Sequence, residues 1–335
     1  MTNHTKTPPS GGWEADIDVV IAWVDGNDPM HKKRIQPYLS PQAQSSDDIA
    51  GPTRYRSEGE IFYCVASVLR FAPFVRKIFI VTDEQNPRLD AFIQNNFPEN
   101  KIPVEIVDHK VIFRGYEEYL PVFNSRAVET CIYRIPDLSE NYVYFNDDFF
   151  LVRPLQITDW YDGDKIVAYG NWRNLIADRL LWLIKPMKNG HKPVGFKDGM
   201  IMGARKYGKK WRYFHLDHMP HPLKKSVIAD YFLKNPDHFV SNISHKFRSG
   251  KQFNTHEIYY LLMLDSDKAV IKPSSEHLLY MKPVNRGKNY LKRKMRTFQS
   301  GNDLKFCCIG SIDMATPDDR NQLLNWLKGI LSVKF

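Results

Sequence analysis

The sequence predicts an α/β fold in which a mostly parallel sheet is flanked by helices and followed by a helical C-terminal portion. Two observations lead to this prediction. Short apolar, β-branched runs alternate with segments of helical periodicity, and most of these runs stop at a polar turn signal. The chain of 335 residues also has 43% hydrophobic and 25% charged residues, values typical of a globular protein with a sizeable core.

The N-terminal half carries the regular part of this alternation. Residues 40–53 interrupt it; they are rich in Ser, Pro, Asp, Gln and Gly and should form a mobile loop. The predicted elements, in chain order, are strand 18–24, helix 58–71, strand 77–82, helix 89–97, strand 104–108, helix 124–133 and strand 141–145. Strands separated by helices favour a parallel sheet.

We expect one α/β domain over residues 16–331, preceded by a flexible N-terminus at 1–15. Within the domain, 16–170 holds the strand-rich core and 171–331 the helical portion. Helices are predicted at 218–233, 255–264 and 318–331. Apolar residues recur on one face of the last helix, which marks the side that packs on the core.

The formal net charge is +9, and basic residues concentrate in 282–296. A basic surface attracts nucleotides, phosphorylated polymers, nucleic acid or anionic lipid, although plain solvation of the run explains it equally well. No zinc-finger spacing, RNA-binding aromatic signature or basic zipper accompanies the run, so no nucleic-acid partner is expected. Attachment of the run to anionic lipid, as a peripheral membrane association, is an open alternative.

The cysteines indicate a reducing compartment. Cys64, Cys131, Cys307 and Cys308 form no CxxC pair, which argues against a zinc site or a disulfide framework. The N-terminus is too polar for a signal peptide, and no apolar stretch approaches the roughly 20 residues that span a bilayer. We therefore expect a cytoplasmic protein, either soluble or peripheral on the inner face of the cell membrane.

Acidic residues follow three of the predicted strands: Asp25 and Asp28, Asp83 and Glu84, and Asp147 and Asp148. Two or three of these groups could meet in one cleft. Asp147 and Asp148 come directly after strand 141–145, where open α/β sheets bind ligands. Two carboxylates at a strand end suit Mg²⁺ or Mn²⁺, which favour oxygen ligands and often bridge to substrate phosphates. The competing interpretation is a turn with solvated aspartates. Asp25 and Asp28 follow the first strand and are either turn residues or a base or phosphate site.

Two histidines and several arginines are further candidates. His218 and His221 lie at the start of the predicted helix 218–233, where a histidine can hold or deliver a proton, although a pair of surface histidines is the simpler interpretation. Arginine presents a planar fork that matches phosphate oxygens. The candidate phosphate-binding residues are Arg54, Arg56, Arg126, Arg248 and Lys251. Asn124 and Ser125 lie beside Arg126 at a predicted helix start, where anions are favoured.

Four blocks of the sequence together resemble the Stealth family of polysaccharide phosphotransferases. The first is 17–29. The second comprises 54–82, 123–126 and 144–150. The third runs from 218–221 to 247–249, and the fourth is 305–313. In the fourth block Asp313 ends a Gly-Ser-Ile-Asp sequence where the family usually shows an Asn-Asp pair, so Asp313 is assigned no role.

The resemblance implies a nucleotide-sugar-transferase core of the GT-A type at 16–170 and an acceptor and catalytic portion at 171–331. It implies transfer of hexose-1-phosphate from a UDP-sugar, such as UDP-GlcNAc, to a sugar hydroxyl of a growing polysaccharide or lipid-linked glycan, with release of UMP. It also implies dependence on Mg²⁺ or Mn²⁺. This capsule-synthesis chemistry is the function that the sequence predicts.

We assign the candidate residues to this reaction as follows. Asp147 and Asp148 would hold the metal. Substrate would contact Arg54, Asn124, Ser125, Arg126 and His221. The catalytic candidates are Asp25, Asp28, His218 and Arg248, and the base is Asp25, Asp28 or His218, with Asp28 as the first choice. Two alternatives stay open: a conventional metal-dependent glycosyltransferase, and a non-catalytic protein that binds an anionic polymer through 282–296.

Overall fold

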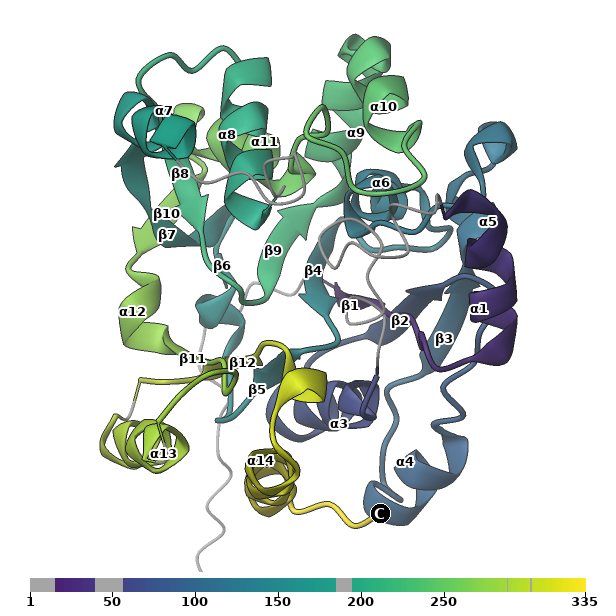
Figure 1. The fold of residues 1–335 in the computed structure, drawn as a ribbon, viewed down its shortest axis with the longest axis vertical. Helices are drawn as coiled ribbons and strands as arrows, with labels where there is room; N and C mark the ends of the chain where they lie inside the picture. The colour runs from purple at the N-terminus through teal and green to yellow at the C-terminus, as the bar shows by residue number, and fades with distance from the viewer. Residues whose placement is uncertain (1–15, 40–56, 185–194, 288, 302) are drawn as a thin grey trace, which may run out of the picture.

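The computed structural model describes residues 16–39, 57–184, 195–287, 289–301 and 303–335. The predictions for residues 1–15 and 40–53 fall outside these ranges. The central element is a five-stranded sheet in the order β3-β2-β1-β4-β9 (Figure 1). Its strands are β1 (Ile17–Ala22), β2 (Lys77–Thr82), β3 (Val104–Asp108), β4 (Asn141–Asn146) and β9 (His221–Lys224).

The first four strands of this sheet are parallel, and only the edge strand β9 is antiparallel. Ala22 of β1 lies beside Val81 of β2 and Asn146 of β4, so these strands end at nearly the same level. The α/β fold with a mostly parallel central sheet is therefore confirmed. The register also places the segments after β1, β2 and β4 next to one another.

Helices of the N-terminal half surround this sheet. They are α1 (Pro29–Ile35), α3 (Glu60–Phe71), α4 (Asp90–Asn96), α5 (His109–Ile112) and α6 (Ser125–Cys131). The predicted helix 58–71 is α3, which ends just before Pro73 as expected. The predicted helix 124–133 is shorter, because Asn124 caps α6 and residues 132–134 form a 3₁₀ turn.

The C-terminal portion mixes strands with helices, so the expectation of a helical portion is only partly right. Two smaller sheets combine strands of this portion with strands that begin within residues 149–170: β10-β7-β6 with β8 on β7, and β11-β12-β5. Their strands are β5 (Phe149–Leu151), β6 (Tyr161–Asp162), β7 (Lys165–Asn174), β8 (Arg212–Leu216), β10 (Ala269–Lys272), β11 (Leu278–Met281) and β12 (Phe306–Ile309). The helices are α7 (Leu175–Ile184), α8 (Phe196–Lys206), α9 (Lys225–Lys234), α10 (Pro236–Ile243), α11 (Thr255–Asp265), α12 (Ser274–His277), α13 (Tyr290–Ser300) and α14 (Pro317–Leu331).

The prediction of a helix at 218–233 is wrong at its start. His218 lies in a turn, His221 opens strand β9, and the helix begins only at Lys225. Pairing of β9 with β4 outweighs the local helical signal. Pro222 fits this strand because β9 is at the edge of the sheet, where a residue without an N–H is tolerated.

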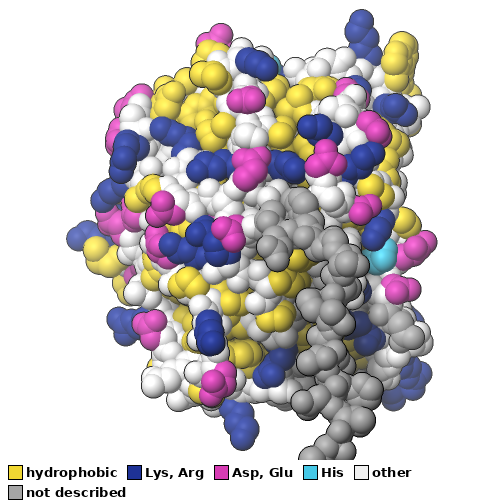
Figure 2. Space-filling view, turned by 180° about the vertical axis from the view of Figure 1, so that it is seen from behind, with side chains coloured by type: hydrophobic (Ala, Val, Ile, Leu, Met, Phe, Trp, Pro, Cys, Tyr) yellow, Lys and Arg dark blue, Asp and Glu magenta, His cyan; other side chains and the backbone are white. Residues whose placement is uncertain are grey.

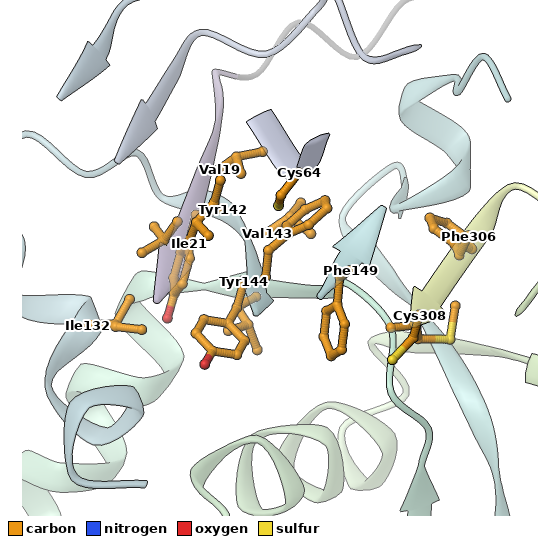
Figure 3. Packing of buried hydrophobic residues seen from close by; sticks show 14 of the residues in the cluster. Val19, Ile21, Cys64, Ile132, Tyr142, Val143, Tyr144, Phe149, Phe306 and Cys308 are labelled. Carbon is orange, nitrogen blue, oxygen red and sulfur yellow. The ribbon is translucent and has the colours of Figure 1, made fainter. Parts of the chain in front are cut away.

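One core joins the central sheet to the β11-β12-β5 sheet. Figure 3 shows Val19 and Ile21 of β1, Tyr142 to Tyr144 of β4, Phe149 of β5 and Cys308 of β12 packed side by side. All four cysteines are buried and free. The described residues contain no helix with the length and apolar character to cross a bilayer.

Candidate functional site

A cavity of about 360 Å³ lies where β1, β2 and β4 end. Its floor comes from residues just after these strands: Trp23, Asp83, Asp147 and Asp148. Segments distant in the chain form the walls. The walls include His31, Glu60, His109, Phe123, Asn124, Ser125, His218, Arg248, Ile309, Ser311 and Asp313. The polar groups thus come from helix starts and loops that only the fold brings together.

The acidic pair Asp147 and Asp148 forms the turn between β4 and β5, as its position after a strand predicts. Burial raises the pKa of Asp148 to about 7, and the thiol of Cys308 donates a hydrogen bond to its Oδ2 over 3.6 Å. Burial, reinforced by the nearby Glu60 carboxylate, also raises the pKa of Asp147 well above its usual range. Three carboxylates therefore crowd one wall of the cavity.

Glu60 belongs to the same acidic wall and begins helix α3. Its Oε2 accepts hydrogen bonds from the Glu58 N–H (2.6 Å) and from the Ser57 hydroxyl (3.3 Å). Burial raises the pKa of Glu60 as well. A group of negative charges that are this poorly solvated would be stabilised by a bound cation.

His218 and Arg248 line the cavity as well, and of the two only Arg248 carries a positive charge near neutral pH. The His218 ring contacts those of Phe196 (centroids 4.8 Å apart) and Tyr280 (5.8 Å). Burial lowers the pKa of His218, and the Arg248 charge adds to this effect while Asp217 opposes it. The imidazole is therefore neutral at pH 7 and able to accept a proton.

Only some of the N–H groups of the Arg248 guanidinium donate hydrogen bonds to described protein atoms. Its Nη2 donates to the Ser125 hydroxyl over 3.2 Å. Its Nε is buried and has no hydrogen-bond partner among the described residues. A buried donor without a partner is costly, so the free Nε–H indicates a place for an anionic ligand.

Asn124 lines the cavity but bonds mainly to protein. Its Oδ1 accepts from the Ala127 N–H (3.0 Å) and from Gln252 (3.1 Å), and its Nδ2 donates to the His245 carbonyl (2.6 Å). Asn124 therefore caps α6 and ties it to the loop that carries Arg248.

Two of the predicted substrate contacts are buried outside the cavity lining. Arg126 donates to the carbonyls of Gly195 (2.6 Å) and Ser249 (3.1 Å), so its guanidinium holds together chain segments far apart in sequence. His221 is buried in β9 with its ring 5.0 Å from that of His256, and burial lowers its pKa well below the usual range. Arg54 lies outside the described residues.

The aspartates after β1 also lie outside the lining. Asp28 caps α1 by accepting from the Met30 N–H (2.9 Å) and also accepts from Gln85 (2.8 Å). The Gln85 bond is the main cause of a lowered Asp28 pKa, which makes this carboxylate a weaker base. Asp25 accepts from the Asn27 N–H (2.8 Å) and gives the local turn its shape.

No role was predicted from the sequence for five cavity residues, namely His31, Glu60, His109, Ser311 and Asp313. Asp83 was expected among the acidic residues at the strand ends, and it lines the cavity just after β2. His109 directly follows β3; burial lowers its pKa to about 4, and its Nδ1 has no hydrogen-bond partner among the described residues. No local sequence pattern identifies this histidine, because it reaches the cavity only through the position of β3 beside β2 in the sheet.

The described residues contain no ready-made cluster of three or more His, Cys, Asp or Glu side chains arranged to hold a metal ion. The pair Asp147 and Asp148 still fits Mg²⁺, since this ion commonly uses one or two carboxylates and takes its other ligands from water and substrate phosphates. The crowded, poorly solvated carboxylates beside Glu60 are the observation that supports this fit.

The fold and cavity define an α/β protein whose strand-end site carries carboxylates, an arginine and a neutral histidine. The chain belongs to the Stealth family: residues 15–40 match Stealth protein CR1, conserved region 1, and residues 54–169 match Stealth protein CR2, conserved region 2. The conserved regions include β1, β2, β3, β4 and the acidic pair.

Named relatives are enzymes of surface-polysaccharide synthesis. A capsular polysaccharide phosphotransferase of Actinobacillus suis is 40% identical over 243 residues, covering 72% of this chain and 62% of that protein. The exopolysaccharide phosphotransferase CpsY of Mycobacterium leprae is 30% identical over 295 residues, covering 87% of this chain and 52% of that protein. The chain thus spans less than two thirds of the length of these relatives. Among solved structures, the galactosyltransferase LgtC has a TM-score of 0.46 at 13% identity, with 95% of this chain and 96% of that chain covered.

Proposed function

We propose that this chain transfers hexose-1-phosphate from a UDP-sugar, such as UDP-GlcNAc, to a sugar hydroxyl of a capsular or other surface polysaccharide, with release of UMP. One observation carries the proposal: the acidic pair, His218 and Arg248 line a single cavity at the strand ends. The names of the relatives support the same reaction class. Because the donor is a nucleotide sugar, we place the reaction in the cytoplasm, with a growing or lipid-linked glycan as acceptor.

Mg²⁺ or Mn²⁺ would be held by Asp147 and Asp148. Bound there, the ion would supply positive charge to the donor diphosphate. Arg248 would add a second positive charge, because its unpartnered Nε–H can bind a phosphate oxygen.

The nucleoside of the donor fits the part of the cavity formed by Trp23, His31, Asp83, His109 and Phe123. Aromatic and apolar side chains there suit a flat base, and the neutral imidazole of His109 leaves a nitrogen for a base or ribose hydrogen bond. This arrangement would leave the diphosphate near the acidic pair.

His218 would take the proton of the acceptor hydroxyl, since its ring is neutral and held by two aromatic neighbours. The hydroxyl oxygen bonds to the β-phosphorus, the phosphorus attached to the sugar. The bond from that phosphorus to the bridging oxygen breaks, and UMP leaves with the bond electrons. The sugar C1–O bond stays intact. Catalysis of this kind depends on positioning and charge stabilisation.

Product analysis with UDP-sugar labelled with ³²P at the β-phosphate tests the proposal. The expected products are unlabelled UMP and a polysaccharide that carries the label. A conventional glycosyltransferase would release labelled UDP and leave the polymer unlabelled. The double variant Asp147→Asn/Asp148→Asn is the matched control and should form neither product.

A further inference from the structure

We propose that the loop after β11 and helix α13 form a cationic surface that binds the growing anionic polysaccharide as it leaves the cavity. The proposal rests on the proposed function and names the part of the molecule that holds the acceptor. We call this surface the basic arm, and its described cationic residues are Lys282, Arg286, Lys292, Arg293, Lys294 and Arg296.

The basic arm begins at the wall of the cavity. Strand β11 runs parallel to β12, with Met281 beside Ile309, and the Gly310 N–H donates to the Met281 carbonyl over 2.9 Å. Ile309 and Ser311 both line the cavity. Lys282 therefore leaves the sheet next to the cavity wall. Its charge also contributes to the lowered pKa of His218, which agrees with this placement.

Aromatic rings connect the cavity to the arm. The Tyr280 ring lies nearly parallel to that of His218, at an angle of 23°. The Tyr290 hydroxyl accepts a hydrogen bond from the Lys282 N–H (3.0 Å), and the Arg286 guanidinium lies 5.4 Å from the centre of the Tyr290 ring. Aromatic faces and cations in alternation are well suited to a chain of sugars and phosphates.

Helix α13 extends the arm by about 16 Å, at 1.5 Å per residue. Within the helix, Leu291 is buried, and Phe298 packs on Trp326 of α14 with ring centres 5.3 Å apart. Lys292, Arg293 and Arg296 are exposed. The helix is thus fixed by its apolar side and presents its cations to solvent.

The cations of the arm have no counter-ions within the described part of the chain. None of the six forms an ion pair there, whereas Lys197 pairs with Asp178 and Lys305 pairs with Asp159. The segment 282–300 contains no acidic residue at all. On the face shown in Figure 2, by contrast, basic and acidic side chains are interspersed. The arm is therefore a local concentration of unpaired positive charge.

The chemistry of the proposed product selects the partner. Each transfer adds one phosphodiester, so the polymer gains one negative charge per unit and its growing end must return to the cavity. A membrane surface fits less well, because the exposed residues of α13 are polar or charged and offer no apolar side chain for insertion. Charge complementarity beside the acceptor entrance favours the polymer.

The test compares two triple variants of equal charge change. Lys292→Gln/Arg293→Gln/Arg296→Gln removes exposed cations of the arm. Arg205→Gln/Lys206→Gln/Lys210→Gln removes exposed cations at and just beyond the end of α8, toward the opposite end of the molecule from α13 (Figure 1). We expect the arm variant to raise KM for a long hexose-phosphate polymer about tenfold, since exposed ion pairs are individually weak and three are lost. KM for a single-unit neutral acceptor and kcat should stay unchanged, as should every parameter of the control.

The rise in KM should also diminish as salt is increased, because salt screens exposed charges. An equal KM for the polymer in the arm variant and the wild type overturns the inference, as does an equal rise in the control variant. Vesicles containing phosphatidylglycerol provide the membrane comparison. Loss of vesicle binding in the arm variant with unchanged polymer affinity would assign the arm to lipid instead. If the wild type releases no UMP with either acceptor, the proposed function is refuted, but the role of the basic arm is not. Binding of the hexose-phosphate polymer to each variant, measured by co-sedimentation, would then test the arm directly.

Discussion

Replacement of His218 by Gln gives the most informative test of the proposed chemistry. Gln keeps a side chain of moderate size beside Phe196 and Tyr280 but cannot act as a base near neutral pH. A positioned base contributes about 10²–10⁴ in rate, which corresponds to about 2.7–5.4 kcal/mol of activation free energy at 1.36 kcal/mol per factor of ten. We expect UMP release by His218→Gln to slow by this factor.

The pH profile separates loss of a base from a merely structural effect. The pKa of His218 is lowered below its usual value of about 6.5. Its neutral form therefore predominates at pH 7–8, and the wild-type rate should fall as the pH drops through this lowered pKa. The profile is recorded at saturating metal, which keeps Asp147 and Asp148 ionised, and under this condition the remaining slow rate of His218→Gln should lack this limb. UMP release is followed by chromatography, with thermal unfolding as the check on the fold. Near-normal turnover, or an unchanged acid limb in the variant, would refute the role of His218.

Three other predictions concern the acid pair, the arginine and the core. Asp148→Asn should abolish metal-dependent UMP release yet leave the metal-free protein at least as stable as the wild type at pH 8. The pKa of Asp148 is raised to about 7 in the folded state, so ionisation of its carboxyl between about pH 4 and pH 7 lowers wild-type stability, whereas the amide does not ionise. A lower melting temperature in the variant would contradict this. Arg248→Lys should raise KM for the UDP-sugar about tenfold, because lysine lacks the planar fork, and an unchanged KM would remove Arg248 from donor binding. Arg76→Ala should destabilise the fold by about 2 kcal/mol, because it leaves the Asp18 carboxylate, which is 0% exposed, without its ion-pair partner. The loss is below the range for a fully buried pair, since Arg76 is 35% exposed and the Ser139 N–H still donates to Asp18. Urea unfolding measures this loss, and Asp18→Asn/Arg76→Ala should recover part of it.

The central sheet was predictable because its strands are short β-branched runs with clear ends. The run at 77–82 became β2 and the run at 104–108 became β3 without change. The position of Asp147 and Asp148 in the cavity was predictable for the same reason, since the ends of parallel strands meet at one edge of the sheet. Their roles, like those of all the site residues, stay predictions.

Long-range packing explains what the sequence did not indicate. Arg126 lies in the first turn of a helix, where an anion is expected, but the fold directs its guanidinium to carbonyls about 70 and 120 residues later. His109 and Glu60 reach the cavity only because β3 pairs with β2 and α3 packs on β5, a neighbourhood that no local pattern encodes. The segment at 218–224 looked helical by itself, and only pairing with β4 makes part of it a strand.

A crystal structure with Mn²⁺ and a UDP-GlcNAc analogue, in which a methylene group replaces the oxygen between the phosphorus atoms, would examine the site most directly. The analogue cannot release UMP, so the complex should persist. We predict an anomalous Mn²⁺ peak between the carboxylates of Asp147 and Asp148, with the diphosphate reaching Arg248. A diphosphate bound outside this cavity, or a metal peak away from both aspartates, would contradict the account.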